Sequence, residues 1–174
     1  MTLYRGTVTL ADCDRDHHAV VEPATLHHPS ETTERLVLRL LAWVLLHQPG
    51  LAARPGRVSE GEAPELAVQD PDGRIIHWIE VGTPDEKRLR KAAGRSDAVT
   101  VVTHEALLGR WRRRLGGRDP AFGGELLVVE TPLVEALARS LPRTFRWQAT
   151  ISGETLYLDD GATTHTSALR RLAC

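Results

Sequence analysis

The chain has 174 residues, of which 41% are hydrophobic and 26% charged, with 22 basic against 23 acidic residues. This composition is typical of one globular domain and excludes a disordered chain, while the net charge of −1 restricts nucleic-acid binding to a local patch. Two cysteines form no disulfide framework, and neither a signal peptide nor an apolar run of roughly 20 residues is present, so we expect a soluble cytoplasmic protein, monomeric by default.

The first part of the chain predicts a hairpin and a long helix. Loose alternation over residues 2–26, broken by a polar turn, indicates an N-terminal β-hairpin. A helix over 30–47 follows, with Ser30 at its N-cap and with Glu31 and Glu34 in the first turn, where the helix dipole favours negative charge. Apolar residues recur along it at helical spacing, which predicts a buried stripe.

The middle of the chain predicts three strands and a second helix. A short strand is expected at 57–59, before a hairpin over 64–81 that turns at 70–73. The run 75–81 is apolar on both faces, as in a central strand. Thr83-Pro84-Asp85-Glu86 combines an N-cap with a proline at the first helical position, and so starts a helix over 84–93.

The last third of the chain repeats the alternation of strand and helix. The predicted elements are a strand at 98–102, a helix at 103–115, a strand at 125–130, a helix from 131 to about 140 and a C-terminal hairpin over 144–158. The polar tail after Asp159 is expected to be poorly ordered. The whole chain, 1–174, is therefore predicted to be a single α/β domain, with a mixed central sheet flanked by helices and a core over 30–103.

Two glutamates and a lysine form the candidate catalytic group. Glu65 stands at the head of one strand of the 64–81 hairpin, Glu80 lies in the other, and Lys91 follows on the next helix. Carboxylates on adjacent strands with a lysine nearby are the skeleton of a magnesium-dependent phosphodiesterase site. Because a buried carboxylate needs a partner, the alternative for Glu80 is a structural ion pair with Arg88 or Lys91.

The phase of the hairpin decides whether these two glutamates meet. If the loop is Asp70–Gly73, Glu65 and Glu80 lie on the same face of the sheet. If the loop is only Pro71–Gly73, Asp70 pairs with Arg74 and the glutamates point to opposite faces, unless one β-bulge restores the phase. We expect the two carboxylates on the same face.

A second candidate surface lies on the 103–115 helix. Trp111 stands among four arginines, which offer phosphate contacts beside a stacking face: Arg110, Arg112, Arg113 and Arg114. The alternative is a solvated last turn, because the helix dipole alone favours basic residues there.

From Ser30 to Val102 the predicted order is helix, three strands, helix, strand, which resembles the PD-(D/E)XK nuclease-like superfamily. The closer resemblance is to the YaeQ family, a variant of that fold. The residues that carry it are His28-Pro29-Ser30-Glu31-Thr32, Glu34-Arg35, Leu38-Arg39-Leu40-Leu41-Ala42-Trp43, Pro64-Glu65, Trp78-Ile79-Glu80, Gly82, Pro84-Asp85-Glu86, Arg88, Lys91-Ala92, Arg143-Thr144 and Gln148-Ala149-Thr150-Ile151.

The resemblance implies a site that binds Mg²⁺ or Mn²⁺ through Glu65 and Glu80, with catalysis by these glutamates and a lysine. The lysine that the superfamily keeps two residues after the second acid is replaced here by Gly82, so Lys91, or else Lys87, is the expected substitute. The expected auxiliary residues are Ser30, Glu31, Glu34, Asp85 and Arg88.

Two hypotheses of function follow from these residues. The first is a metal-dependent nuclease or related phosphodiesterase, which the retained glutamates and Lys91 favour. The second is a nuclease-like module without catalysis that binds nucleic acid or protein, which the substitution at Gly82 favours.

Overall fold

The computed structural model describes residues 1–53 and 63–174, so the predicted strand at 57–59 lies outside the described residues. The described chain forms two compact units, one of residues 1–47 and 129–170, the other of residues 48–128 and 171–174. The first unit is therefore discontinuous in sequence. Strands β8 (Glu125–Val129) and β11 (Thr164–Ala173) each have residues in both units.

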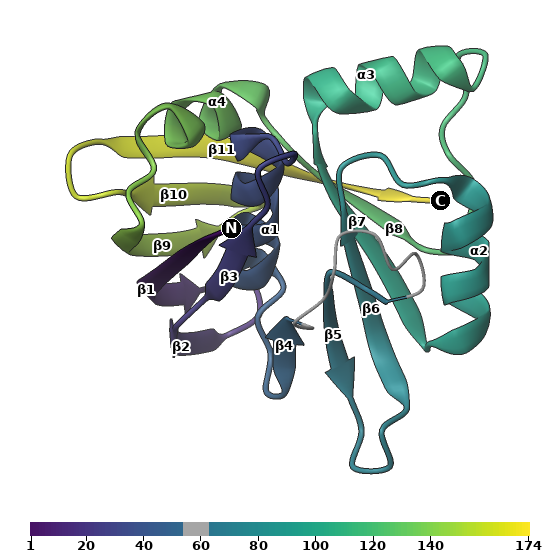
Figure 1. Ribbon diagram of the computed structural model, residues 1–174, viewed down its shortest axis with the longest axis horizontal. Helices are drawn as coiled ribbons and strands as arrows, with labels where there is room; N and C mark the ends of the chain where they lie inside the picture. Colours follow the sequence, from purple (N-terminus) through teal and green to yellow (C-terminus); the bar gives the residue numbers. More distant parts are fainter. Residues whose placement is uncertain (54–62) are drawn as a thin grey trace. The chain divides into compact units, whose positions relative to one another are not determined.

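The strands of the first unit pair in the order β2-β1-β9-β10-β11, and β3 pairs with β1 (Figure 1). Besides β11 they are β1 (Thr2–Asp12), β2 (His17–Val21), β3 (Ala24–His27), β9 (Thr144–Ser152) and β10 (Thr155–Asp159). β9 alternates strictly between exposed and buried residues, as expected of a sheet with one covered face. The predicted hairpins at both ends of the chain are present as β1–β2 and β9–β10.

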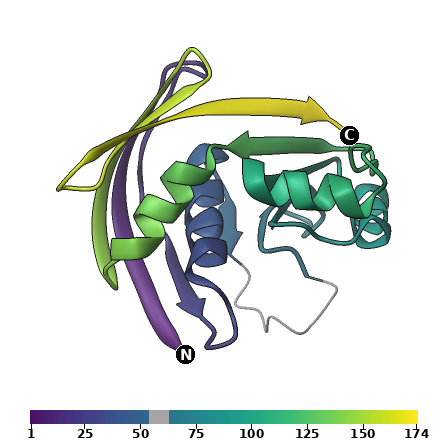
Figure 2. The ribbon, with the colours of Figure 1, turned by 90° about the horizontal axis from the view of Figure 1, so that it is seen from above.

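Two helices belong to the first unit, α1 (Thr33–Leu45) and α4 (Thr131–Ser140), and Figure 2 shows them side by side. α1 begins later than predicted. Its N-cap is Thr32, whose hydroxyl accepts the Arg35 N–H at 3.2 Å. Ser30 lies before the helix, and its hydroxyl forms a hydrogen bond of 2.7 Å with the His28 ring. Threonine is almost as good an N-cap as serine, so the sequence alone does not separate the two.

The second unit has a mixed sheet in the order β8-β7-β6-β5-β4. Its other strands are β4 (Leu51–Ala53), β5 (Leu66–Gln69), β6 (Ile75–Val81) and β7 (Ala98–His104), and its helices are α2 (Glu86–Arg95) and α3 (Glu105–Arg114). β5 runs antiparallel to β4 and β6, while β6 and β7 are parallel across α2. The order from α1 to β7 is helix, three strands, helix, strand, but the first strand, β4, lies before the predicted 57–59 and was not expected from the sequence.

α2 also begins later than predicted. Its N-cap is Asp85, whose carboxylate accepts the Lys87 N–H at 2.7 Å, and Thr83 and Pro84 precede it. Glu86 does not close a capping box. Its carboxylate instead accepts hydrogen bonds from Arg118 and from the Ala121 N–H, at 2.7–2.9 Å, and so ties the loop after α3 to the start of α2.

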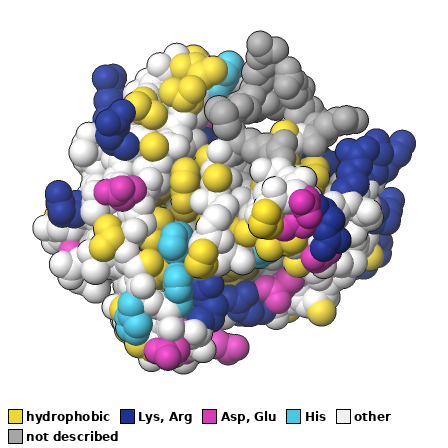
Figure 3. Space-filling model, turned by 90° about the horizontal axis from the view of Figure 1, so that it is seen from below, with side chains coloured by type: hydrophobic (Ala, Val, Ile, Leu, Met, Phe, Trp, Pro, Cys, Tyr) yellow, Lys and Arg dark blue, Asp and Glu magenta, His cyan; other side chains and the backbone are white. Residues whose placement is uncertain are grey.

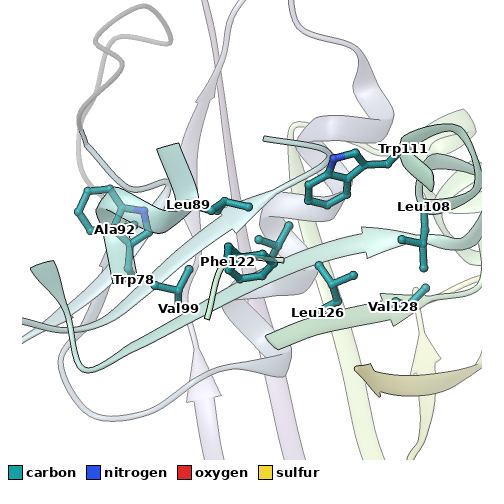
Figure 4. Close-up of a cluster of buried hydrophobic side chains, with 10 residues drawn as sticks. Trp78, Leu89, Ala92, Val99, Leu108, Trp111, Phe122, Leu126 and Val128 are labelled. Atoms are coloured by element: carbon teal, nitrogen blue, oxygen red, sulfur yellow. The ribbon is translucent and has the colours of Figure 1, made fainter. Parts of the chain in front are cut away.

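Helices α2 and α3 bury their apolar sides against one face of the β6–β7–β8 strands (Figure 4). The cluster between them holds Trp78, Leu89, Ala92, Val99, Val101, Leu108, Trp111, Phe122, Leu126 and Val128. Trp111 is only 3% exposed, so the predicted stacking face beside the arginines of α3 is wrong. At the position before Arg112, the indole lies on the apolar stripe of the helix and contributes to the core instead.

The tail after Asp159 is not disordered, which corrects the prediction. β11 pairs antiparallel with β10, and Ser167 and Leu169 are buried between exposed neighbours. Its end joins the second unit, where Leu172 and Cys174 pack against the hydrophobic cluster. The Cys174 carbonyl accepts the N–H groups of Phe122 and Gly123 at 2.6 and 2.8 Å. The pairing partner of the tail, not its own hydrophobicity, orders it.

Candidate functional site

A β-bulge in the β5–β6 hairpin sets the positions of the two candidate glutamates. The turn is the shorter of the two alternatives, because Asp70 donates its N–H to the Arg74 carbonyl at 2.9 Å. The register shifts by one residue between Val68 and Gln69, and this shift restores the phase. Leu66 pairs with Ile79, so Glu65, one residue earlier, comes opposite Glu80.

Glu80 is buried and hydrogen-bonded within the second unit. It is 3% exposed, and its Oε1 accepts the Trp78 indole N–H at 2.8 Å. Arg88 on α2 donates to the same oxygen from Nε at 3.2 Å and from Nη2 at 2.6 Å. Nη2 of Arg88 also donates to the Ala63 carbonyl at 2.8 Å. The ion pair that was the structural alternative for Glu80 is thus present, with Arg88 as the partner.

Opposing effects act on the ionisation of Glu80. Burial raises the pKa of its carboxyl above the ordinary value, while the hydrogen bond from Trp78 and the charge of Arg88 lower it. The negative charge of Glu65 raises the pKa further, as expected for two facing carboxyls.

Glu65 and Glu80 are the candidate ligands of a divalent ion. The oxygen atoms of Glu65 and Glu80 suit Mg²⁺ or Mn²⁺ in kind. However, Oε1 of Glu80 already accepts three hydrogen bonds, two of them from a cationic guanidinium. Across residues 1–53 and 63–174, no three His, Cys, Asp or Glu side chains are grouped so as to hold a metal. As arranged, the residues do not fit a resident ion.

A pocket of about 320 Å³ opens beside this ion pair, between α2 and the indole of β6. Its lining consists of Trp78, Asp85, Lys87, Arg88, Lys91, Ala92 and Arg95. Both lysines considered for the place of Gly82 therefore line the same pocket, together with two of the predicted auxiliary residues. Helical spacing explains the grouping, because residues three, four and seven apart share one side of a helix.

Three of the pocket's cations have no counter-charge among the described residues. Within the described parts of the chain, the side chains of Lys87, Lys91 and Arg95 take part in no ion pair or hydrogen bond. Arg88 is held by Glu80, and Asp85 directs its carboxylate at the backbone N–H of Lys87. The pocket therefore presents exposed positive charge beside the largely buried side chains of Trp78 and Ala92.

The basic residues of the chain are concentrated in the stretch of sequence that contains α2 and α3. Residues 85–119 contain ten Lys and Arg against five Asp and Glu, while the whole chain has one more acidic than basic residue. Figure 3 shows Lys and Arg side chains gathered along the edge where α2 lies. This is the local basic patch that a protein of net charge −1 needs in order to bind a polyanion.

The four arginines of α3 differ in their exposure and in their partners. Arg110, Arg113 and Arg114 are exposed, whereas Arg112 donates from Nε to the Asp119 carboxylate at 2.6 Å. Three of the four arginines predicted to contact nucleic acid are therefore accessible, whereas the indole of Trp111 is not.

The remaining predicted auxiliary residues belong to the first unit. Glu31 is buried, and its Oε1 accepts hydrogen bonds from Arg39 and, at 2.9 Å, from Arg35. Arg39 also donates to the Thr25 hydroxyl at 3.0 Å, so this network ties β3 to α1. Glu34 is exposed in the first turn of α1.

Besides Ala92, two pocket residues, Trp78 and Arg95, were not among the predicted site residues. Both follow from periodicity once Glu80 and Lys91 are chosen. Trp78 lies two residues before Glu80, on the same face of the strand, and Arg95 lies one helical turn after Lys91.

The fold defines a mixed α/β protein with four helices in its described residues, none of them long and apolar enough to cross a membrane. The sequence matches the model of the YaeQ protein family over residues 1–169. It is 30% identical over 161 residues to the uncharacterized protein YaeQ of Escherichia coli (strain K12), covering 91% of this chain and 88% of that protein. The chain belongs to the YaeQ family.

Solved structures of two YaeQ proteins have the same fold. The Pseudomonas syringae structure has a TM-score of 0.88 at 30% identity, covering 99% of this chain and 96% of its own. The structure from Xanthomonas axonopodis pv. citri has a TM-score of 0.85 at 29% identity, with coverage of 99% and 98%.

Proposed function

We propose that this protein is a nuclease-like module that binds nucleic-acid phosphates in the α2 pocket without cleaving them. The observation that carries the proposal is that Lys87, Lys91 and Arg95, all without a counter-charge among the described residues, line one pocket. Phosphate groups are the ligands that such a cluster binds through charge and hydrogen bonds. The guanidinium of Arg88 on Glu80 favours binding over catalysis, because it neutralises the carboxylate that a metal would need.

The proposal is tested by the salt dependence of binding to a single-stranded oligonucleotide, measured by fluorescence anisotropy. Three phosphate contacts predict a slope of log K against log salt of about −2. The triple variant Lys87→Gln, Lys91→Gln, Arg95→Gln should lose most of the affinity and nearly all of the slope. A matched control removes three exposed arginines of the first unit by Arg139→Gln, Arg143→Gln and Arg170→Gln. Equal binding by the two triple variants would contradict the proposal.

A second candidate is phosphodiester hydrolysis that depends on Mg²⁺ or Mn²⁺. The bulge that brings Glu65 opposite Glu80 favours it, because two facing carboxylates are the ligands such enzymes use. It requires Arg88 to leave Oε1 of Glu80 before an ion binds. Lys91 or Lys87 would then take the part of the lysine absent at Gly82.

Calorimetric titration of Mg²⁺ and Mn²⁺ separates the two candidates. Binding to the wild type that disappears in both Glu80→Ala and Glu80→Gln, with folding checked by circular dichroism, would support the metal-dependent enzyme. The absence of binding heat in the wild type, together with salt-dependent oligonucleotide binding, would leave the non-catalytic module.

A further inference from the structure

The balance of charge in the α2 pocket narrows the kind of phosphate that it suits. Among the described residues, the lining holds four cationic side chains and one carboxylate, that of Asp85. Arg88 is matched by Glu80 behind it, so an excess of two positive charges faces the pocket. A phosphodiester within a strand carries one negative charge, whereas a phosphomonoester carries about −1.5 to −2 at pH 7. Two opposed charges therefore fit a phosphomonoester better.

The size and lining of the pocket also favour a phosphomonoester. About 320 Å³ is at the lower end of small-ligand pockets, and suits one nucleotide rather than a run of them. Trp78 of β6 lines one side and is only 4% exposed, while Lys87, Lys91 and Arg95 stand on α2, which forms the other side. The exposed part of the lining is therefore cationic and suits a highly charged phosphate.

We infer that the α2 pocket recognises the terminal phosphomonoester of a nucleic-acid strand, rather than the phosphodiesters within it. This inference rests on the proposed function and narrows its ligand. Lys87, Lys91 and Arg95 take the phosphate. Recognition of a strand end differs from non-specific backbone binding because one site per strand is bound, whatever the length of the strand.

The experiment compares three single-stranded 12-mers of one sequence, with an internal fluorophore and a 5′-phosphate, a 3′-phosphate or hydroxyls at both ends. At pH 7.5 one phosphorylated strand should bind roughly tenfold more tightly than the hydroxyl strand, the size expected of one extra charge-assisted contact. Lys91→Gln should remove this preference, while Arg139→Gln on α4 should keep it. A nucleoside monophosphate, used as a competitor, distinguishes strand ends from free nucleotides, and its competition would also support phosphomonoester recognition.

The dependence on pH gives a second, independent readout. The second pKa of a phosphomonoester is about 6, so the preference for the phosphorylated strand should shrink between pH 7.5 and 5.5. No histidine is among the described residues that line the pocket. Burial raises the pKa of Glu80, and protonation of this carboxyl would make the pocket more positive and strengthen binding of every strand, which is the opposite sign.

Different results would contradict end recognition and phosphate binding. Equal binding of all three strands at pH 7.5 would overturn end recognition and leave the proposed function standing. Binding of none of them, with the protein folded by circular dichroism, would overturn both.

Discussion

Arg88 holds a carboxylate that burial would otherwise drive toward its neutral form. The side chain of Arg88 is 26% exposed, and Glu80 receives two of its hydrogen bonds. Arg88→Met should lower the free energy of unfolding by about 2 kcal/mol at pH 7, because it leaves a buried charge with the Trp78 N–H alone. Urea unfolding measures this loss. Arg95→Met, on the same helix but outside any ion pair of the described residues, is the control.

The sign of the pH dependence of Arg88→Met follows from the pKa of Glu80. The pKa of the Glu80 carboxyl is higher in the folded protein than its ordinary value of about 4.5. Such a carboxyl stabilises the fold at pH values below 4.5, and this contribution is lost as the pH rises through the pKa of the folded protein. Removing Arg88 raises the pKa of Glu80 further, so the deficit of the variant should grow from pH 4.5 to pH 8. A deficit that shrinks over this range would contradict the assignment.

Glu86 has the opposite ionisation. The hydrogen bonds from Arg118 and the Ala121 N–H lower the pKa of its carboxyl to about 2. A lowered pKa contributes stability above the ordinary value of about 4.5, and this contribution is lost as the pH falls toward 2. An NMR titration of the side-chain carboxyl should place its midpoint near 2 and move it part of the way back in Arg118→Ala. Arg114→Ala should leave the midpoint unchanged.

At the scale of elements, α2 carries like charges where a stable helix would alternate them. Lys87, Lys91 and Arg95 follow one another at intervals of four residues, and each such pair is unfavourable by about 0.2–0.5 kcal/mol. Lys91→Gln removes two of these pairs and should raise the free energy of unfolding by about 0.5 kcal/mol while it weakens phosphate binding. Lys91→Arg should leave stability unchanged. A destabilised Lys91→Gln would show that the lysine has a structural partner.

The starts of the helices show what local sequence can and cannot predict. Both α1 and α2 were expected from their capping residues and apolar periodicity, and both are present. Each begins two or three residues later than expected, because two good N-cap residues stand close together and tertiary contacts select one. The carboxylate of Glu86 binds Arg118, 32 residues away, and no local pattern contains that partner.

The parts of the candidate site that follow from strand and helix periodicity were predictable from the sequence. Period two along β6 places Trp78 with Glu80, and period 3.6 along α2 groups Lys87, Arg88, Lys91 and Arg95. The sequence left two loops open, Asp70–Gly73 and the shorter Pro71–Gly73. It also left open whether a bulge follows the shorter loop, because a one-residue shift in register leaves no mark in composition. Which cation binds Glu80 also remained open until the helix was placed against the strand.

At the scale of the whole molecule, the element that the sequence hid was β11. Its alternation is short, and only Ser167 and Leu169 are buried in its first-unit part. Such a strand can be identified only from the strand with which it pairs, and that strand lies elsewhere in the chain. Its last residues belong to the core of the second unit, which no reading of a polar tail suggests.

Leu172 tests the contribution of this strand to the second unit. It is partly buried against the hydrophobic cluster, so Leu172→Ala should cost about 1–2 kcal/mol, less than truncation of a fully buried leucine. Amide hydrogen exchange in β7 and β8 should speed up accordingly. Ala173→Ser, at an exposed neighbouring position, should change neither measurement.

The division of the chain into a discontinuous unit and an inserted one has a consequence for synthesis on the ribosome. Residues 48–128 emerge before residues 129–170, so the second unit has most of its sequence while the first still lacks half of its sheet. Neither unit is complete until late, because residues 171–174 supply the final contacts of the second. A nascent chain stalled before α4 would therefore leave α1 and β1 without their partners α4 and β9, and chaperones could bind the apolar surfaces that these partners cover in the folded protein.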